Sequence, residues 1–196
     1  EKKGGKALAI QCDVSDSMAA VQLVQEVENT WGRIDALING AGPYHRVPLF
    51  EETADGWSEM FNNNLHPIFY LAKAVAPGMK ARQSGRIISF SMANADKMEA
   101  QPSVTAHYIA KAGVLILTRT LAKILAPDGI TVNAVSPGWI DSGSAPPGEL
   151  DGMAKQIPAG YIGQVEDTVQ AVRYFLSDEA RYVTGANLHV SGGWGV

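Results

Sequence analysis

The sequence predicts an α/β fold in which a parallel β-sheet carries helices on both faces. Short apolar runs alternate along the chain with longer segments whose apolar residues recur at helical spacing. This alternation is typical of parallel strands joined by helices. The chain has 196 residues, of which 46% are hydrophobic and 18% are charged. That length and composition suit one domain, over 1–196, with a sizeable core.

The first predicted strand is "ALAI" at residues 7–10. A helix is expected over 16–31, because its valines recur on one helical face and Ser15 or Asp16 can cap its start. The run "DALINGA" at 35–41 is almost continuously apolar, as strands buried on both faces usually are.

A long helix is expected over 57–80. Pro67 lies inside it and cannot donate a backbone hydrogen bond to the carbonyl of Asn63. We therefore predict a kink next to Asn64.

The rest of the chain continues the alternation and shows no internal repeat or second domain. Its predicted elements are a strand at 85–91, a helix at 104–127, a strand at 130–138, a helix at 164–177 and a strand at 187–193. The segment 141–160 is rich in glycine, proline and serine, and it is expected to be a mobile loop that contributes to substrate binding.

Composition and charge exclude several classes of function. The net charge is −4 with no run of basic residues, so a nucleic-acid partner is not expected. No apolar run reaches the ~18 residues of a membrane span. The single cysteine, Cys12, cannot form an internal disulfide, and the histidines lack metal-ligand spacing. We expect a cytoplasmic protein without a metal site.

Candidate binding residues follow the predicted strands, because ligands of parallel α/β sheets bind beyond the carboxyl ends of the strands. These positions are Asp13, Gly40 to Gly42, Ser91 to Asn94, and Pro137 to Ser142. Gly40 and Gly42 also permit a close approach of the backbone to a ligand.

These positions carry a recognisable series of short motifs. In chain order they are "CDVSD", "LINGAG", "NNNLHPIF", "YIAKAG", "GITVNAVSPGWI", "SDEARYVTG" and "VSGG". Together they resemble the short-chain dehydrogenase/reductase family, in particular its 3-oxoacyl-carrier-protein reductase type, from about Lys6 to Gly193. The resemblance implies a Rossmann-type, doubly wound αβα fold, NAD or NADP as cofactor, and hydride transfer at a carbonyl or alcohol carbon of a small molecule. It also implies a homo-oligomer, either a dimer or a tetramer.

The resemblance also implies which residues bind the cofactor. Asp13 matches the acid that contacts the adenine, and Lys111 matches the lysine that bonds the nicotinamide ribose. The complete implied set is Asp13, Val14, Asn39, Ala41, Gly42, Lys111, Pro137, Gly138, Ile140 and Ser142.

The first departure from the family concerns the start of the chain. The family begins with a strand, a glycine-rich turn and a helix that hold the pyrophosphate. Here "EKKGGKALAI" resembles the approach to the third strand, so a βαβ unit of roughly 30 residues or more is absent. Without it, the strand at 7–10 would have no neighbour. We therefore expect this sequence to be a piece of a longer chain; the alternative is a naturally shortened protein with a rearranged sheet.

The second departure concerns the catalytic residues. Lys111 and Asn64 match the family pattern. The family tyrosine lies four residues before the lysine, where this chain has His107, and Tyr108 lies one residue late. The family serine is also displaced, because Ser91 lies one residue before the position expected from the strand. Counting back from the helix places that position at Asn94 instead.

Both displaced residues remain candidate proton donors. On a helix, residue 107 lies about 40° to one side of residue 111, and residue 108 lies about 60° to the other side. A nearby Lys111 would favour a Tyr108 phenolate, and it would disfavour a charged His107. Ser91 or Asn94 remains able to hydrogen-bond a carbonyl oxygen.

Several functions remain compatible with this pattern. The protein is an active reductase with a relocated donor, a reductase with weak or different activity, or a dinucleotide-binding protein without catalysis. A further alternative is a structural subunit that associates with an active relative through the helices at 57–80 and 104–127.

Overall fold

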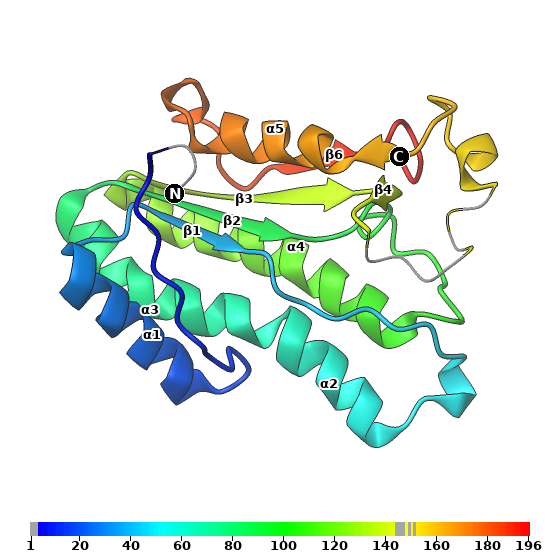
Figure 1. Cartoon of the computed structure of the whole chain (residues 1–196), viewed down its shortest axis with the longest axis horizontal. Helices are drawn as coiled ribbons and strands as arrows, with labels where there is room; N and C mark the ends of the chain where they lie inside the picture. Colours follow the sequence, from blue (N-terminus) through cyan, green and yellow to red (C-terminus); the bar gives the residue numbers. More distant parts are fainter. Residues whose placement is uncertain (1–3, 144–147, 149, 151) are drawn as a thin grey trace.

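The sheet has four parallel strands, in the spatial order β1-β2-β3-β6 (Figure 1). The computed structural model describes residues 4–143, 148, 150 and 152–196. The strands are β1 (Ala36–Asn39), β2 (Gly85–Phe90), β3 (Ile130–Pro137) and β6 (Asn187–Val190). All three pairings are parallel, so the predicted α/β fold with a parallel sheet is confirmed.

The two central strands form the middle of the core. Ile87 of β2 pairs with Val132 of β3, and both side chains are fully buried. Almost every residue of β3 is buried, as expected for a parallel strand that is covered on both faces.

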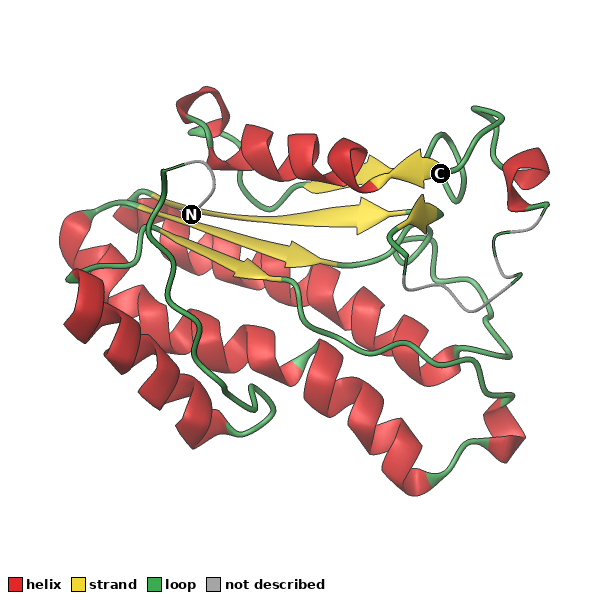
Figure 2. Cartoon of the chain, viewed as in Figure 1, coloured by secondary structure: helices red, strands yellow, loops and turns green. Residues whose placement is uncertain are grey.

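Helices cover both faces of the sheet and make three layers (Figure 2). One face carries α3 (His66–Arg82) and α4 (Thr105–Leu125); α1 (Ser17–Trp31) packs on α3, and α2 (Ala54–Asn64) packs on α4. The other face carries α5 (Val165–Leu176). The remaining elements are η1 (Leu49–Glu51), η2 (Ala126–Asp128), η3 (Met153–Gln156), η4 (Asp178–Ala180) and a small parallel pair, β4 (Ile140–Asp141) with β5 (Gly163–Gln164). No helix of the described part is both long and apolar enough to cross a membrane.

The predicted helix at 16–31 is confirmed together with its caps. Of the two candidate caps, Asp16 takes the role, and its carboxylate accepts hydrogen bonds from the backbone N–H groups of Met18 and Ala19. Gly32 ends the helix with φ 81°, a left-handed conformation that glycine adopts without strain.

The single helix predicted over 57–80 is wrong, because the chain forms two helices there. α2 ends at Asn64, Leu65 separates the helices, and Pro67 lies in the first turn of α3. Proline is well tolerated in a first turn, where its missing N–H has no helical partner to serve. The predicted kink next to Asn64 is therefore confirmed, in the form of a complete break.

The strand predicted at 7–10 is also wrong, because these residues form no strand. The Leu8 side chain is exposed, and residues 7–10 pair with no strand of the described sheets. In the predicted loop at 141–160, residues 144–147, 149 and 151 lie outside the described residues. The rest of that loop contains η3, and its mobility stays a prediction.

Candidate active site

A cavity of about 780 Å³ lies beyond the carboxyl ends of β1, β2 and β3. The segments that follow these strands make its base, and the start of α4 makes one wall. Its described lining consists of Gly42, Pro43, Tyr44, Arg46, Ser91, Met92, Gln101, Pro102, Ser103, Val104, His107, Lys111, Pro137, Gly138, Trp139, Ile140, Ser142, Leu150 and Trp194. Three of the five predicted catalytic residues, Ser91, His107 and Lys111, thus line one cavity.

Lys111 is held at the inner end of the cavity by contacts between α4 and β2. Its Nζ atom donates a hydrogen bond to the carbonyl oxygen of Phe90 at 3.0 Å. The Ser91 hydroxyl donates to the carbonyl oxygen of Lys111 at 2.8 Å. Burial lowers the pKa of Lys111 to about 8. The side chain is therefore mostly a cation at pH 7, and its pKa lies close to neutral pH.

His107 lies one helical turn before Lys111 and is buried. Burial lowers its pKa to about 3, with smaller contributions from the charges of Lys111 and His45. The imidazole is consequently neutral at physiological pH. Its Nδ1 atom is buried without a hydrogen-bond partner among the described protein groups. A neutral imidazole can donate one hydrogen bond and accept another, so His107 is suited to hold a polar group of a ligand.

Tyr108 points away from the cavity and is absent from its described lining. Its hydroxyl donates to the carbonyl oxygen of Asn94 at 2.8 Å and accepts from the backbone N–H of Glu99 at 3.0 Å. Asn94 has a φ of 64°, which is uncommon outside glycine, and its side-chain oxygen is buried without a partner. Tyr108 therefore ties the loop after β2 to the start of α4.

Asn64 lies beside the cavity but does not line it. Its side-chain N–H₂ group donates to the carbonyl oxygen of Pro43 at 3.1 Å, while its Oδ1 atom is buried without a partner. A β-carbon at Gly42 would collide with this Oδ1 atom. The end of α2 and the turn after β1 are therefore packed directly against each other.

The residues expected to bind the cofactor fall into two groups. Pro137, Gly138, Ile140, Ser142, Gly42 and Lys111 line the main cavity. The other group surrounds an apolar cavity of about 330 Å³ beside β1, between α1 and α3, and includes Val14, Asn39 and Ala41.

Asp13, next to Val14 in the chain, is fully exposed. Its carboxylate accepts hydrogen bonds from the hydroxyl and the backbone N–H of Ser15 at 2.7 and 2.9 Å. These bonds lower the pKa of Asp13, so this side chain is an anion at neutral pH.

The chemistry of these residues fits a dinucleotide. The Asn39 Oδ1 atom is buried without a partner among the described groups, while its N–H₂ group donates to the Ser89 hydroxyl at 3.1 Å. Lys111 and Arg46 contribute positive charge to the main cavity, and no carboxylate occurs among its described lining residues. Cationic and hydrogen-bonding groups of this kind suit the phosphates and hydroxyls of a dinucleotide. Among the described residues, no three metal-ligating side chains form a cluster.

Sequence reasoning missed one aromatic residue of the cavity, Tyr44. Tyr44 lines it, and its ring packs edge-on against His107 with 5.1 Å between the ring centroids. Trp139 and Trp194 form a second edge-on pair at 5.7 Å. The one available signal for Tyr44 was its position two residues after Gly42, in the turn that follows a strand.

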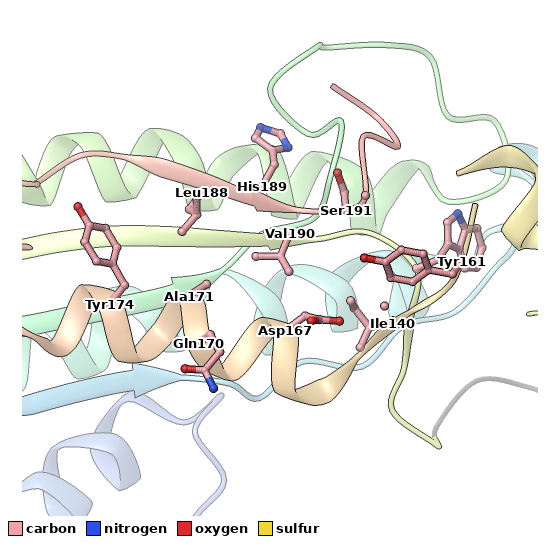
Figure 3. Close-up of a pocket in the computed structure, with 13 residues that line it drawn as sticks. Ile140, Tyr161, Asp167, Gln170, Ala171, Tyr174, Leu188, His189, Val190 and Ser191 are labelled. Carbon is pink, nitrogen blue, oxygen red and sulfur yellow. The ribbon is translucent and has the colours of Figure 1, made fainter. Parts of the chain in front are cut away.

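A separate cavity of about 470 Å³ lies between α5 and β6 (Figure 3). Leu188 and Val190 point from β6 toward α5, whereas His189 points away from that helix. Asp167 and Gln170 of α5 supply polar groups to the lining. None of the predicted catalytic residues is among the described residues that line this cavity, so the main cavity remains the candidate active site.

The chain is similar in sequence to known reductases. Residues 1–195 match the family described as enoyl-(acyl carrier protein) reductase. The chain is 33% identical over 193 residues to the 3-oxoacyl-(acyl-carrier-protein) reductase FabG of Haemophilus influenzae, covering 97% of this chain and 79% of that protein. It is 37% identical over 196 residues to the FabG of Staphylococcus epidermidis, with the same coverage of both chains.

A solved structure is also similar over almost the whole chain. It is a Sinorhizobium meliloti protein assigned as a short-chain alcohol dehydrogenase. The two structures superpose with a TM-score of 0.92 at 27% sequence identity, and the match covers 98% of this chain and 78% of the other. The likeness therefore extends from the sheet to the helices on both of its faces.

Proposed function

Because the chain belongs to the short-chain dehydrogenase/reductase family, we propose that it is an NAD- or NADP-dependent oxidoreductase that interconverts a carbonyl group and an alcohol. The curated relatives are named as reductases of 3-oxoacyl groups on acyl carrier protein, which favours a 3-oxoacyl thioester as the substrate. The observation that carries the proposal is the cavity in which Ser91, His107 and Lys111 meet the residues at the end of β3.

The dinucleotide would bind along the carboxyl edge of the sheet. Lys111, Pro137, Gly138, Ile140 and Ser142 would hold its nicotinamide half, and Asp13, Val14, Asn39, Ala41 and Gly42 its adenosine half. When bound, the nicotinamide supplies the hydride that converts a carbonyl carbon into an alcohol carbon.

Each side chain in or beside the cavity has its own role in the proposed reaction. The Lys111 ammonium stabilises negative charge that develops on the substrate oxygen. His107 is neutral, so its N–H group holds that oxygen by a hydrogen bond, but it does not supply a proton as an imidazolium would. Ser91 would have to release the carbonyl oxygen of Lys111 before its hydroxyl donated to substrate. Asn64 acts through Pro43, whose carbonyl oxygen it holds in place.

One observation favours a second candidate, a dinucleotide-binding protein or structural subunit without catalysis. The hydroxyl protons of Tyr108 and Ser91 are both engaged with backbone carbonyl oxygens. Neither residue is therefore poised to act on a substrate in this arrangement.

We also propose that the protein is a homo-oligomer that associates through α4. Ile109, Ile116 and Ile124 are exposed on this helix at intervals of about two turns, so they lie on one face. Light scattering after size exclusion should give a mass that is a multiple of the chain mass. Ile116→Lys should reduce that mass to a single chain.

The test of the proposed activity is binding followed by turnover. Calorimetry with NADPH and with NADH should detect saturable binding of at least one of them. With acetoacetyl-coenzyme A as a 3-oxoacyl probe, the absorbance of the reduced dinucleotide that binds should then fall with time. Binding without consumption against a panel of carbonyl compounds supports the non-catalytic alternative, and failure to bind either dinucleotide contradicts both candidates.

A further inference from the structure

Tyr44 lines the candidate active site and lies outside the tyrosine–lysine motif of α4. We propose that Tyr44, rather than His107 or Tyr108, is the catalytic proton donor of this protein. This inference rests on the proposed carbonyl reduction and assigns its proton. Among the described residues that line the main cavity, Tyr44 carries the only phenol.

The position of the Tyr44 ring supports this assignment. It contacts the His107 ring edge-on at 5.1 Å between centroids, with the ring planes at 82°. His107 occupies the place four residues before Lys111, on the same side of α4 as the lysine. Tyr44 thus reaches from the turn after β1 to His107, the residue that holds the usual donor position, and it lines the same cavity as Lys111.

The backbone next to Tyr44 is held in place by Asn64 at the end of α2. The carbonyl oxygen of Pro43 accepts a hydrogen bond from the buried Asn64 side chain at 3.1 Å. Gly42 packs so closely on Asn64 that a β-carbon there would overlap it. A donor must keep a reproducible position relative to the reacting atoms, and this anchored turn provides one.

The hydroxyl of Tyr44 has the hydrogen-bond arrangement that a donor requires. Nη2 of Arg46 donates to the Tyr44 oxygen at 3.1 Å. Because this bond uses a lone pair of the oxygen, the phenolic hydrogen remains available to donate in another direction. The Tyr108 hydroxyl has the opposite arrangement, since its hydrogen is directed to the carbonyl oxygen of Asn94.

The other titratable groups of the cavity are less suited to the role. His107 carries no ionisable imidazolium proton at neutral pH, because burial keeps its ring neutral. The Lys111 ammonium is oriented by its bond to the carbonyl oxygen of Phe90. Lys111 therefore contributes positive charge next to the reaction, while a separate phenol contributes the proton.

The proposed step balances as follows. The carbonyl carbon would receive a hydride with its electron pair from the reduced nicotinamide dinucleotide, and the π pair of the C=O bond would move onto oxygen. The O–H bond of Tyr44 breaks and a new O–H bond forms on the substrate oxygen. The alcohol then dissociates, and Tyr44 remains as a phenolate. Tyr44 is 44% exposed, so water can return the proton. In the oxidative direction, the phenolate accepts the alcohol proton.

Tyr44→Phe tests the assignment, because phenylalanine keeps the ring that contacts His107 and removes only the hydroxyl. With acetoacetyl-coenzyme A and the reduced dinucleotide, we expect kcat to fall by roughly 10²- to 10⁴-fold, the range typical of a lost general acid. Dinucleotide affinity and the thermal midpoint should stay unchanged. Tyr182→Phe is the matched control, since Tyr182 is 98% exposed, and it should keep the wild-type kcat.

A binding measurement separates a lost donor from a displaced turn. Calorimetry of acetoacetyl-coenzyme A with protein saturated by the oxidised dinucleotide involves no turnover. Tyr44→Phe should weaken that binding by roughly three- to tenfold, as expected for one lost hydrogen bond. An active wild-type protein whose Tyr44→Phe variant retains kcat overturns the assignment of Tyr44 alone. An inert wild-type protein overturns the proposed reduction, and the donor role is overturned with it.

Discussion

The hydroxyl of Tyr108 donates a hydrogen bond of 2.8 Å to the carbonyl oxygen of Asn94, fourteen positions earlier in the chain. The Tyr108 hydroxyl oxygen also accepts a hydrogen bond from the backbone N–H of Glu99, so one buried phenol joins two points of the loop that follows β2. Gln101, Pro102 and Ser103 continue this loop and line the cavity. Tyr108 therefore determines the shape of a cavity wall without entering the cavity.

Removing the Tyr108 hydroxyl should loosen this wall. Tyr108→Phe leaves the Asn94 carbonyl and the Glu99 N–H without their partner, which should lower the free energy of unfolding by about 1 to 3 kcal/mol. We expect KM for the 3-oxoacyl probe to rise more than kcat falls, because the wall shifts while the reacting groups stay in place. Urea unfolding and steady-state kinetics measure both effects. A loss confined to kcat would instead place Tyr108 at the reacting atoms.

The stability of the protein should depend on the protonation of His107 below neutral pH. Its folded pKa of about 3 lies below the ordinary value of 6.5, so the unfolded chain binds more protons between these values. The free energy of unfolding therefore falls as the pH decreases from about 6.5 to 3. At pH 5 the free energy of unfolding is lower than at high pH by about 2 kcal/mol because of this group. The charges of Lys111 and His45 both disfavour the imidazolium, and the Tyr44 ring packs edge-on against the imidazole.

His107→Leu isolates this contribution, because leucine is buried without titrating. Urea unfolding at pH 7 and pH 5 should show a smaller drop for the variant than for the wild-type protein. His66→Leu is the control, since the side chain of His66 is only partly buried. Equal drops in wild type and in His107→Leu would contradict the buried neutral state.

The buried ammonium of Lys111 should reduce stability at neutral pH. Its folded pKa of about 8 lies below the ordinary value of 10.5, which corresponds to a cost of about 3 kcal/mol when the group is charged in the folded protein. The cost is fully present below pH 8 and is relieved as the pH rises toward 10.5. Lys111→Met removes this cost but also loses the hydrogen bond to the carbonyl oxygen of Phe90. The net effect should be a rise of roughly 1 to 2 kcal/mol in the free energy of unfolding at pH 7.

The same variant should lose dinucleotide binding, so stability and function change in opposite directions. The exposed Lys123 of α4 provides a matched control, and Lys123→Met should alter neither property. A drop in the stability of Lys111→Met at pH 7 would show that the ammonium contributes more through its contacts than its burial costs.

The sequence predicted the sheet well because the buried strands are encoded locally. The apolar run around Ile87 and the one around Val132 can pack only in a sheet covered on both faces, and both strands formed. The break beside Asn64 was predictable for a similarly local reason, the missing N–H of Pro67. The strand at 7–10 failed because strand formation needs a neighbour, which a local apolar run does not specify.

The active-site geometry was harder to predict because it depends on contacts between distant segments. Spacing along α4 placed both His107 and Tyr108 next to Lys111. Only the fold directs Tyr108 to the carbonyl of Asn94 and brings Tyr44 from the end of another strand onto His107. Helical periodicity gives the angle at which a side chain leaves the helix axis, but it does not identify the group at the other end of a hydrogen bond.

The contact between Gly42 and Asn64 leads to a prediction about the turn that carries Tyr44. A β-carbon at position 42 would overlap the Asn64 Oδ1 atom and lie 3.2 Å from its Cγ atom. Gly42→Ala should therefore displace the Asn64 side chain from the Pro43 carbonyl. We expect the free energy of unfolding to fall by about 1 to 3 kcal/mol, as overpacking typically costs.

A double-mutant cycle identifies the source of this cost. In an Asn64→Ala background the overlapping atoms are absent, so the further change Gly42→Ala should cost less than about 1 kcal/mol. Gly40→Ala serves as the control, because the nearest atom to its β-carbon would be on Phe90 at 4.0 Å. Urea unfolding of the four proteins of the cycle measures the coupling. If Gly42→Ala costs the same in both backgrounds, the turn is fixed by contacts other than the Asn64 side chain. Strong coupling, by contrast, would mean that Asn64 holds the position of Tyr44 through two adjacent residues of one turn.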